Sequence, residues 1–398
     1  MKKTRRDEIE KSTGMILAHA GEEYDQYYNA IVPPIFMNSL NIFPTVDAYY
    51  DSDKRDRHTY CYGRVQNPTV RILEEKINEL EKGAETYVFS SGMAAATAAV
   101  LSACKSGGHV VCVRTAYGPL KDFLQNYCRE HMNIRTTLID GDDPMEMEEA
   151  LTEETQLLVL ESPSSVVFHV QDIERAAEAA HKKGALVYID NTFCTPIYQN
   201  PIEMGADFVM HTASKYLGGH SDLIGGSLTV KDPALGKKVR IMREQLGSII
   251  GPMEGWLMMR GLRTLEVRVK EHAKTALAIA QYLEGHTKVR KVYYTGLASH
   301  PQRELIIKQQ SGHTGLLSFE LESTTEQAKT FCQALKIFKI GVSWGGYESL
   351  VTMPYARETE ENARKMGAGQ NVIRIHCGLE GTKALMDDLE QAFQKVFR

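Results

Sequence analysis

The sequence predicts an α/β fold with a mainly parallel sheet covered by helices on both faces, followed by a smaller α+β unit. Short apolar runs between residues 86 and 211 alternate with helical patterns, and these runs contain few polar positions. Strands that are apolar throughout are typical of parallel sheets buried on both faces. Residues 255–398 show a different order of elements, which indicates the second unit. A chain of 398 residues is long enough for two or three such units.

The first regular element is expected after Asn67, which reads as a helix N-cap followed by proline at the first helical position. Apolar residues then share one helical face: Val70, Leu73, Ile77 and Leu80. Residues 1–60 lack such periodicity. They are interpreted as an arm that contacts a neighbouring subunit, with a plain N-terminal tail as the alternative. The expected division is therefore 1–60, 61–254 and 255–398.

The alternating part of the chain contains six predicted strands and four intervening helical patterns. The strands lie at 86–89, 109–113, 134–139, 156–161, 185–190 and 206–211. The helical patterns lie at 92–104, 119–131, 145–152 and 172–184. In the second unit, the sequence predicts helices at 264–284, 325–338 and 383–397 and strands at 315–323 and 372–379.

Composition excludes several classes of protein. Hydrophobic residues make up 43%, charged residues 24%, and the net charge is -5, which argues against nucleic acid as a partner. No apolar stretch approaches a membrane span, and the first residues lack the apolar core of a signal peptide. The seven cysteines are scattered without CxxC spacing, so neither a disulfide framework nor a metal site is expected. These observations favour a cytoplasmic protein.

Three of the predicted strand ends carry residues suited to chemistry, and ligands of open α/β sheets bind at such ends. In "TYVFSSGMAAA" a strand passes through Gly92 into a helix, where free backbone amides can bind phosphate. Asp190 ends the run "ALVYID", and Lys215 follows "ADFVMHTAS". Each feature has an ordinary alternative: helix capping at Gly92 and Asp190, and a charged loop at Lys215.

Taken together, the three features match the needs of pyridoxal phosphate. This cofactor requires an amine that forms an imine, a carboxylate that keeps its pyridine nitrogen protonated, and donors for its phosphate. Lys215 and Asp190 supply the first two. Thr212 and Ser214 are two residues apart, so on a continuous strand both hydroxyls would face the phosphate.

Nine motifs resemble a known family: "YGRVQNPT", "SSGMAA", "AYGP", "ESPSS", "IDNTFCTP", "SKYLGGHSD", "RGLRTL", "SWGGYESL" and "RIHCGLE". They are similar to those of the fold-type I pyridoxal-phosphate enzymes of cysteine and methionine metabolism, which include cystathionine lyases, cystathionine synthase and methionine γ-lyase. The resemblance runs from Val32 almost to the end of the chain. It implies the fold-type I transferase fold, an amino-acid substrate, and a homotetramer built from two dimers.

The resemblance also implies roles for single residues at the cofactor. Lys215 would be the Schiff-base lysine and later the general base, and Asp190 would pair with the pyridinium nitrogen. The phosphate would be bound by the amides of Gly92 and Met93 and by the hydroxyls of Thr212 and Ser214.

Further roles are implied at the substrate and between subunits. Tyr117 would stack on the cofactor ring and assist proton transfer, and Arg374 would bind the substrate α-carboxylate. The motif with Ser343 and Trp344 would line the substrate pocket. Tyr62 and Arg64 would reach the phosphate of the neighbouring subunit. From the sequence alone, surface ion pairs or core packing are the alternatives for Tyr62, Arg64, Arg374 and Trp344.

The motifs indicate more than one member of the family. "SWGGYESL", with Trp344 after the serine, is most similar to bacterial cystathionine β-lyases, which favours β-elimination from cystathionine or cystine. Val342 and "YGRVQNPT" are more similar to γ-type enzymes, which leaves a γ-lyase or γ-replacement enzyme acting on methionine, cystathionine, O-acetylhomoserine or canavanine as the alternative. Ser165, where many members have asparagine, and Pro119 receive no role.

Two other classes of protein agree less well with the sequence. A nucleotide-binding α/β protein would show a GxGxxG turn after its first strand, and none occurs. An inactive relative would be expected to lose some of the chemistry-bearing residues, whereas Lys215, Asp190, Tyr117 and Arg374 are all intact.

Overall fold

A computed structural model describes residues 12–51 and 59–397 of the chain. Its larger sheet has seven strands in the order β1-β7-β6-β5-β4-β2-β3. Their bounds are β1 Glu85–Phe89, β2 His109–Val113, β3 Arg135–Ile139, β4 Thr155–Glu161, β5 Leu186–Asp190, β6 Phe208–Thr212 and β7 Gly226–Val230. Strands β2 to β6 pair in parallel, whereas β7 runs antiparallel to both β1 and β6. The predicted mainly parallel sheet is confirmed, with all six predicted strands in it.

Strand β7 was not predicted, yet it sets the geometry of the sheet. Gly226 pairs with Phe89 on one side and with Thr212 on the other. The carboxyl ends of β1 and β6 therefore lie at the same edge of the sheet, on either side of Gly226. A Cβ atom on Gly226 would lie 2.4 Å from the carbonyl oxygen of Ser91. Glycine is therefore required where the loop after β1 crosses β7.

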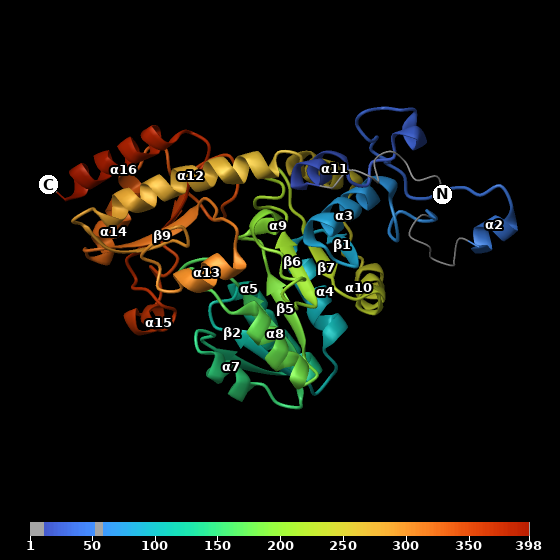
Figure 1. Ribbon diagram of the computed structural model, residues 1–398, viewed down its shortest axis with the longest axis horizontal. Helices are drawn as coiled ribbons and strands as arrows, with labels where there is room; N and C mark the ends of the chain where they lie inside the picture. The colour runs from blue at the N-terminus through green and yellow to red at the C-terminus, as the bar shows by residue number, and fades with distance from the viewer. Residues whose placement is uncertain (1–11, 52–58, 398) are drawn as a thin grey trace.

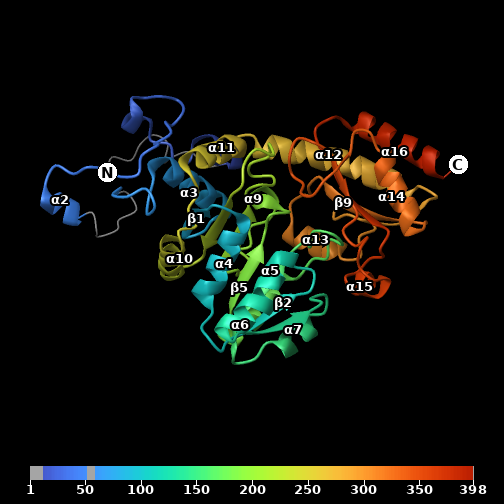
Figure 2. The same cartoon turned by 180° about the vertical axis from the view of Figure 1, so that it is seen from behind.

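Helices cover the large sheet on both faces. Figure 1 shows α8 and α9 in front of the sheet, and Figure 2 shows α4, α5 and α6 in front of it from behind. Strand β1 illustrates the two cores: Tyr87 and Phe89 belong to the core that contains α4, whereas Val88 belongs to the core that contains α3. The helix bounds are α3 Pro68–Glu81, α4 Gly92–Ala103, α5 Gly118–Asp122, α6 Arg129–Met132, α7 Pro144–Ala150, α8 Ile173–Lys182, α9 Thr195–Tyr198 and α10 Pro233–Leu246.

Two predicted elements differ in detail. The helix expected at 119–131 is divided into α5, a π-helical turn η4 (Phe123–Cys128) and α6. Strand β6 ends at Thr212, and Ser214 lies in the turn that follows. The interpretation that Thr212 and Ser214 share one strand face is therefore wrong, because strand alternation stops before Ser214.

The C-terminal part forms a second, smaller sheet in the order β10-β11-β12-β9-β8. Its strands are β8 Val289–Tyr293, β9 Leu316–Leu321, β10 Lys339–Ile340, β11 Leu350–Thr352 and β12 Val372–His376. Its helices are α11 Pro252–Leu262, α12 Leu265–Glu284, α13 Arg303–Gln309, α14 Thr325–Ala334, α15 Glu360–Lys365 and α16 Thr382–Val396. The long helix α12 runs from the large sheet to the small one (Figure 1). The predicted strands correspond to β9 and β12, and the short strands β8, β10 and β11 were missed.

The expected arm, residues 1–60, falls partly outside the described residues, which exclude 1–11 and 52–58. Its described part contains α1 Thr13–His19, a short 3₁₀ turn η2 Tyr24–Tyr27 and α2 Val46–Asp51. The segment with α2 extends away from the rest of the chain in both views (Figures 1 and 2). It exposes large apolar side chains, namely Ile31, Met37, Ile42, Val46 and Tyr50.

All seven cysteines are free thiols. Among residues 12–51 and 59–397, no group of three or more His, Cys, Asp or Glu side chains is arranged to hold a metal ion. Within the same ranges, no helix combines the length and the apolar character needed to span a membrane.

Candidate active site

A pocket lies where the carboxyl ends of β4, β5 and β6 meet the C-terminal unit. Its empty volume, which includes space open to solvent, is about 660 Å³. It is lined by Tyr117, Glu161, Pro163, Ser165, Asp190, Thr192, Phe193, Thr212, Lys215, Val342, Ser343, Trp344 and Arg374. Seven of the residues singled out from the sequence for roles at the site are thus brought together: Tyr117, Asp190, Thr212, Lys215, Ser343, Trp344 and Arg374.

Lys215 lies in the turn after β6 and points into this pocket. Its Nζ donates a hydrogen bond to Ser343 Oγ at 2.8 Å and lies 5.7 Å from the centre of the Trp344 ring. Burial, assisted by the positive charge of Arg374, lowers the pKa of Lys215 to about 8, and Asp190 opposes this shift. A lysine with such a pKa has a substantial neutral fraction near pH 7.5 and can act as a nucleophile or base.

Asp190 is the last residue of β5 and is held by Thr192. The backbone N–H and the hydroxyl of Thr192 both donate to Asp190 Oδ1, at 2.9 and 2.5 Å. Burial raises the pKa of Asp190, and the hydrogen bonds from Thr192 oppose this rise. A buried carboxylate in this position is stabilised by a cation beside it, as a protonated ring nitrogen would be.

The loop after β1 forms a cradle for an anion. Ser91 is the N-cap of α4: its hydroxyl accepts from the amide of Ala94. The amides of Gly92 and Met93, the first two helical residues, have no hydrogen-bond acceptor among the described residues. A Cβ atom on Gly92 would lie 2.1 Å from Thr212 Oγ1, so the helix start and the Thr212 hydroxyl are in direct contact. Two free amides and a hydroxyl together suit a phosphate group.

If this loop holds a cofactor phosphate, as the resemblance implies, replacing Gly92 with alanine should weaken binding of pyridoxal phosphate by about 10- to 100-fold, because overpacking costs about 1–3 kcal/mol and Thr212 must move. The dissociation constant can be measured by absorbance after the cofactor is removed by dialysis. Gly285→Ala is the matched control, since its Cβ would meet only carbonyl oxygens at 3.8 Å. Unchanged affinity in Gly92→Ala would contradict the assignment of this loop.

The C-terminal unit supplies the other wall of the pocket. Arg374 on β12 donates from Nη1 to the carbonyl oxygen of Ser165 at 3.1 Å and forms no ion pair with a described residue. Burial lowers the pKa of Arg374, with Glu161 opposing the shift. Ser343 has a φ of 90°, an uncommon conformation for a residue other than glycine. This conformation accompanies the hydrogen bond from Lys215, 128 residues away in sequence.

Glu161 was not singled out from the sequence, although it ends an apolar strand just as Asp190 does. It is buried, and β4 and β5 pair so that Glu161 and Asp190 are direct neighbours. Its carboxylate accepts hydrogen bonds from the amides of Tyr117 at 2.7 Å and Ser165 at 3.0 Å. Tyr117 itself is half-exposed at the start of α5. An acidic residue at the end of a second buried strand was the signal that could have identified Glu161.

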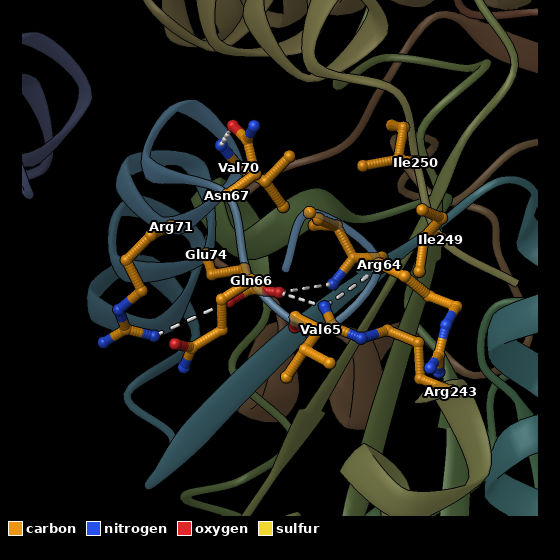
Figure 3. Close-up of a pocket in the computed structure, with 12 residues that line it drawn as sticks. Arg64, Val65, Gln66, Asn67, Val70, Arg71, Glu74, Arg243, Ile249 and Ile250 are labelled. Carbon is orange, nitrogen blue, oxygen red and sulfur yellow. Dashed lines mark hydrogen bonds and ion pairs between the residues drawn. The ribbon is translucent and has the colours of Figure 1, made fainter. Parts of the chain in front are cut away.

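Tyr62 and Arg64 do not line the pocket with Lys215. Arg64 instead lines a small cavity between α3 and α10, shown in Figure 3. Its Nη1 donates to the carbonyl oxygen of Glu244 at 2.6 Å, and its guanidinium lies 5.7 Å from the centre of the Tyr62 ring. Beneath this loop, the buried Arg243 pairs with Glu74 and donates to the carbonyl oxygen of Val65 at 2.9 Å. Ser214, Gly92 and Met93 are also absent from the described lining of the Lys215 pocket.

A comparison with protein families decides between the alternatives. Residues 14–394 match the model of the Cys/Met metabolism PLP-dependent enzymes. The chain belongs to this family. Its cofactor is accordingly pyridoxal 5'-phosphate, and the nucleotide-binding alternative is excluded. Lys215, Asp190 and the loop at Gly92 fit the three requirements of this cofactor, namely an amine that forms an imine, a carboxylate beside the ring nitrogen and donors for the phosphate.

Curated relatives and solved structures cover almost the whole chain. The sequence is 36% identical over 393 residues to a cystathionine gamma-lyase of Bacillus subtilis, which covers 98% of this chain and 100% of the relative. It is 35% identical to a cystathionine beta-lyase of Coxiella burnetii, over 94% of this chain and 96% of the relative. The structure of cystathionine gamma synthase from Xanthomonas oryzae pv. oryzae, in complex with aminoacrylate and cysteine, has a TM-score of 0.91 at 33% identity and covers 98% and 99% of the two chains. Relatives with different reactions are thus almost equally similar.

Proposed function

We propose that this member of the family is a carbon–sulfur lyase that performs β-elimination on cystathionine or cystine and gives pyruvate, ammonia and a thiol, which is released from cystine as a persulfide. The observation that carries this proposal is the position of Lys215 between Ser343 Oγ and the Trp344 ring. β-Elimination needs proton removal only at Cα before the leaving group departs. γ-Elimination also needs proton transfers at Cβ, and therefore a lysine that is freer to move.

Six residues of one subunit would bind the aldehyde carbon, the ring nitrogen and the phosphate of the cofactor in this proposal. Lys215 would bind it covalently, Asp190 would pair with its ring nitrogen, and Gly92, Met93 and Thr212 would hold its phosphate. Ser214 is proposed to add a second hydroxyl from the turn after β6. Bound pyridoxal phosphate supplies a ring that accepts electrons from the substrate's α-carbon.

The remaining steps belong to side chains of the pocket. Lys215 Nζ would take the proton from the substrate Cα as a general base, since its lowered pKa increases the fraction of neutral amine. Arg374 would hold the α-carboxylate, because its planar guanidinium suits a bidentate carboxylate. Tyr117 would stack on the ring and assist proton transfer. Trp344 and Ser343 would bound the space for the leaving group.

A γ-lyase or γ-replacement enzyme acting on methionine, cystathionine, O-acetylhomoserine or canavanine is the second candidate. Val342 favours it, because this side chain is 89% exposed in the single chain and lines the pocket beside Ser343. A small apolar residue at this position leaves space for a longer substrate side chain.

The keto acid formed distinguishes the two candidates. The purified protein is incubated with cystathionine, cystine, methionine, O-acetylhomoserine and canavanine, and the keto acid is identified by chromatography. We expect pyruvate from cystathionine and cystine. If 2-oxobutanoate or a replacement product predominates, the γ-candidate is correct and β-elimination is rejected.

The proposed assembly is a homotetramer built from two dimers. Tyr62 and Arg64, which lie away from the Lys215 pocket of their own chain, would reach the cofactor phosphate of the neighbouring subunit. Mixing Lys215→Ala chains with Arg64→Ala chains tests this assignment. A mixed dimer contains one site with both residues intact, so activity should rise well above that of either variant alone. No rise on mixing would reject the shared site.

A further inference from the structure

A buried carboxylate, Glu161, connects three walls of the pocket without having been given a role above. It is the last residue of β4 and directly neighbours Asp190, the last residue of β5, in the parallel pairing of the two strands. Its side chain lines the same pocket as Lys215 and Arg374. Only 7% of the residue is exposed, so bulk water solvates its carboxylate poorly and protein groups must provide its hydrogen bonds.

Both oxygens of Glu161 accept hydrogen bonds from backbone amides of other pocket segments. Oε2 accepts from the amide of Tyr117 at 2.7 Å, at the start of α5. Oε1 accepts from the amide of Ser165 at 3.0 Å, in the loop after β4. The carbonyl oxygen of Ser165 in turn accepts from Arg374 Nη1 at 3.1 Å. A continuous chain of contacts therefore joins β4 to Arg374 on the C-terminal sheet.

We propose that Glu161 is a positioning residue that sets the place of Arg374 through Ser165, and with it the binding of the substrate carboxylate, and that it fixes Tyr117 at the same time. The proposal rests on the function proposed above, because it takes Arg374 as the group that binds the carboxylate. It deepens that function by naming the residue on which the placement of Arg374 depends.

The geometry requires a carboxylate of this length. Two N–H donors from different segments point at two oxygens, and only a carboxylate offers two acceptors in this arrangement. Glutamine would turn its NH₂ group toward one of the two N–H donors, which leaves that donor unsatisfied. Aspartate is one methylene shorter and cannot keep both contacts without movement of a loop.

The electrostatic surroundings also connect Glu161 to the chemistry. Burial, together with the neighbouring Asp190, raises the pKa of Glu161, whereas the hydrogen bonds from the amides of Tyr117 and Ser165 favour the ionised carboxylate and oppose the rise. Arg374 is a half-buried cation whose pKa is lowered by burial, and the negative charge of Glu161 opposes that shift. A ligand carboxylate at Arg374 is therefore expected to depend on both residues.

A matched control exists in the C-terminal unit. Asp388 is also buried, and its carboxylate accepts from the backbone amides of Lys336, Ile337 and Phe338 at 2.7, 2.7 and 3.1 Å. It performs the same local task as Glu161 but does not line the pocket. Loss of such a carboxylate should lower stability in both places and alter ligand binding only at Glu161.

The test measures binding of propionate, a carboxylate without an amine, to the cofactor-loaded protein. The chain has two tryptophans, so a Trp256→Phe background leaves Trp344 in the pocket as the fluorescent reporter. We expect Glu161→Gln to weaken propionate binding about tenfold and Glu161→Asp to give a smaller loss. Asp388→Asn should lower the melting temperature and leave the dissociation constant within twofold.

A double-mutant cycle separates positioning from general destabilisation. In an Arg374→Ala background, Glu161→Gln should change propionate binding less than about twofold, since the residue through which it acts is gone. Independent, additive losses, or an unchanged dissociation constant in both Glu161 variants, would overturn the proposal.

Failure of the proposed function would give a different result. Borohydride reduction of the wild-type protein, followed by peptide mapping, reports whether the cofactor is fixed to Lys215, and Glu161 has no part in that attachment. An unlabelled Lys215 would reject the proposed function. A labelled Lys215 together with unaffected propionate binding in the Glu161 variants would reject only the role of Glu161.

Discussion

Replacing Lys215 with alanine is expected to lower kcat/KM by at least about 10³-fold, because a positioned general base alone contributes about 10²–10⁴-fold. The variant also loses the amine that would fix the cofactor. Borohydride reduction followed by peptide mass mapping should therefore label Lys215 in the wild type and nothing in the variant. Lys76 is an internal control: its pKa is also lowered to about 8, by burial, but it is paired with Glu22 at 3.3 Å, away from the pocket. Label on Lys76 in place of Lys215 would show that a low pKa alone explains the reaction.

The rate at which the cofactor attaches to Lys215 should depend on pH. With its pKa lowered from 10.5 to about 8, the neutral amine of Lys215 makes up about a quarter of the population at pH 7.5, against about 0.1% for an ordinary lysine. The neutral form is the nucleophile, so the rate of cofactor attachment to the cofactor-free protein should rise with pH and level off above about 8.5. Stopped-flow absorbance between pH 6.5 and 9.5 measures this profile. A rate that still rises tenfold per pH unit at pH 9.5 would contradict the lowered pKa.

Replacing Arg374 with alanine is expected to lower kcat/KM by about 10²–10⁴-fold, since each hydrogen bond to a charged group contributes about 1.5–3 kcal/mol and a guanidinium forms two with a carboxylate. Arg374→Lys keeps the charge and loses the planar fork, so its loss should be intermediate. The loss should appear mainly in KM, with cofactor affinity unchanged.

Two controls make this result specific. Arg357→Ala removes an exposed arginine of the same C-terminal unit and should leave the kinetics unchanged. The methyl ester of the substrate has no carboxylate, so the activity of wild type and Arg374→Ala toward it should differ less than about threefold. An equally large loss with the ester would mean that Arg374 maintains the pocket and does not bind the carboxylate.

Much of the large sheet could be predicted because its information is local. The runs ending at Glu161, Asp190 and Thr212 are apolar strands by composition alone. Strand β7 is different, because its place depends on pairing with β1 and β6, which lie on either side of it in the sheet. Strand β1 is more than a hundred residues away from β7 in the sequence. Strands β10 and β11 are two and three residues long, too short to show alternation.

The candidate site divides in the same way. Lys215 and Asp190 could be proposed from their positions at strand ends. The contact of Lys215 with Ser343 joins residues that are 128 positions apart in sequence. The φ of 90° at Ser343 could not be predicted, because serine does not usually adopt this conformation. The two amides that meet at Glu161 come from loops whose approach depends on packing. Resemblance to a family supplied Arg374, for which the local pattern favoured core packing or a surface ion pair.

The pocket takes its two sets of functional groups from different sheets: Lys215 and Asp190 from the first, Ser343, Trp344 and Arg374 from the second. On the proposed roles, inheritance can act on the two sets separately. Substitutions within residues 338–376 can change the amino acid that is accepted as substrate, while the residues that would bind the cofactor stay the same. Relatives named for γ- and β-type reactions have nearly the same identity to this chain, at 36% and 35%.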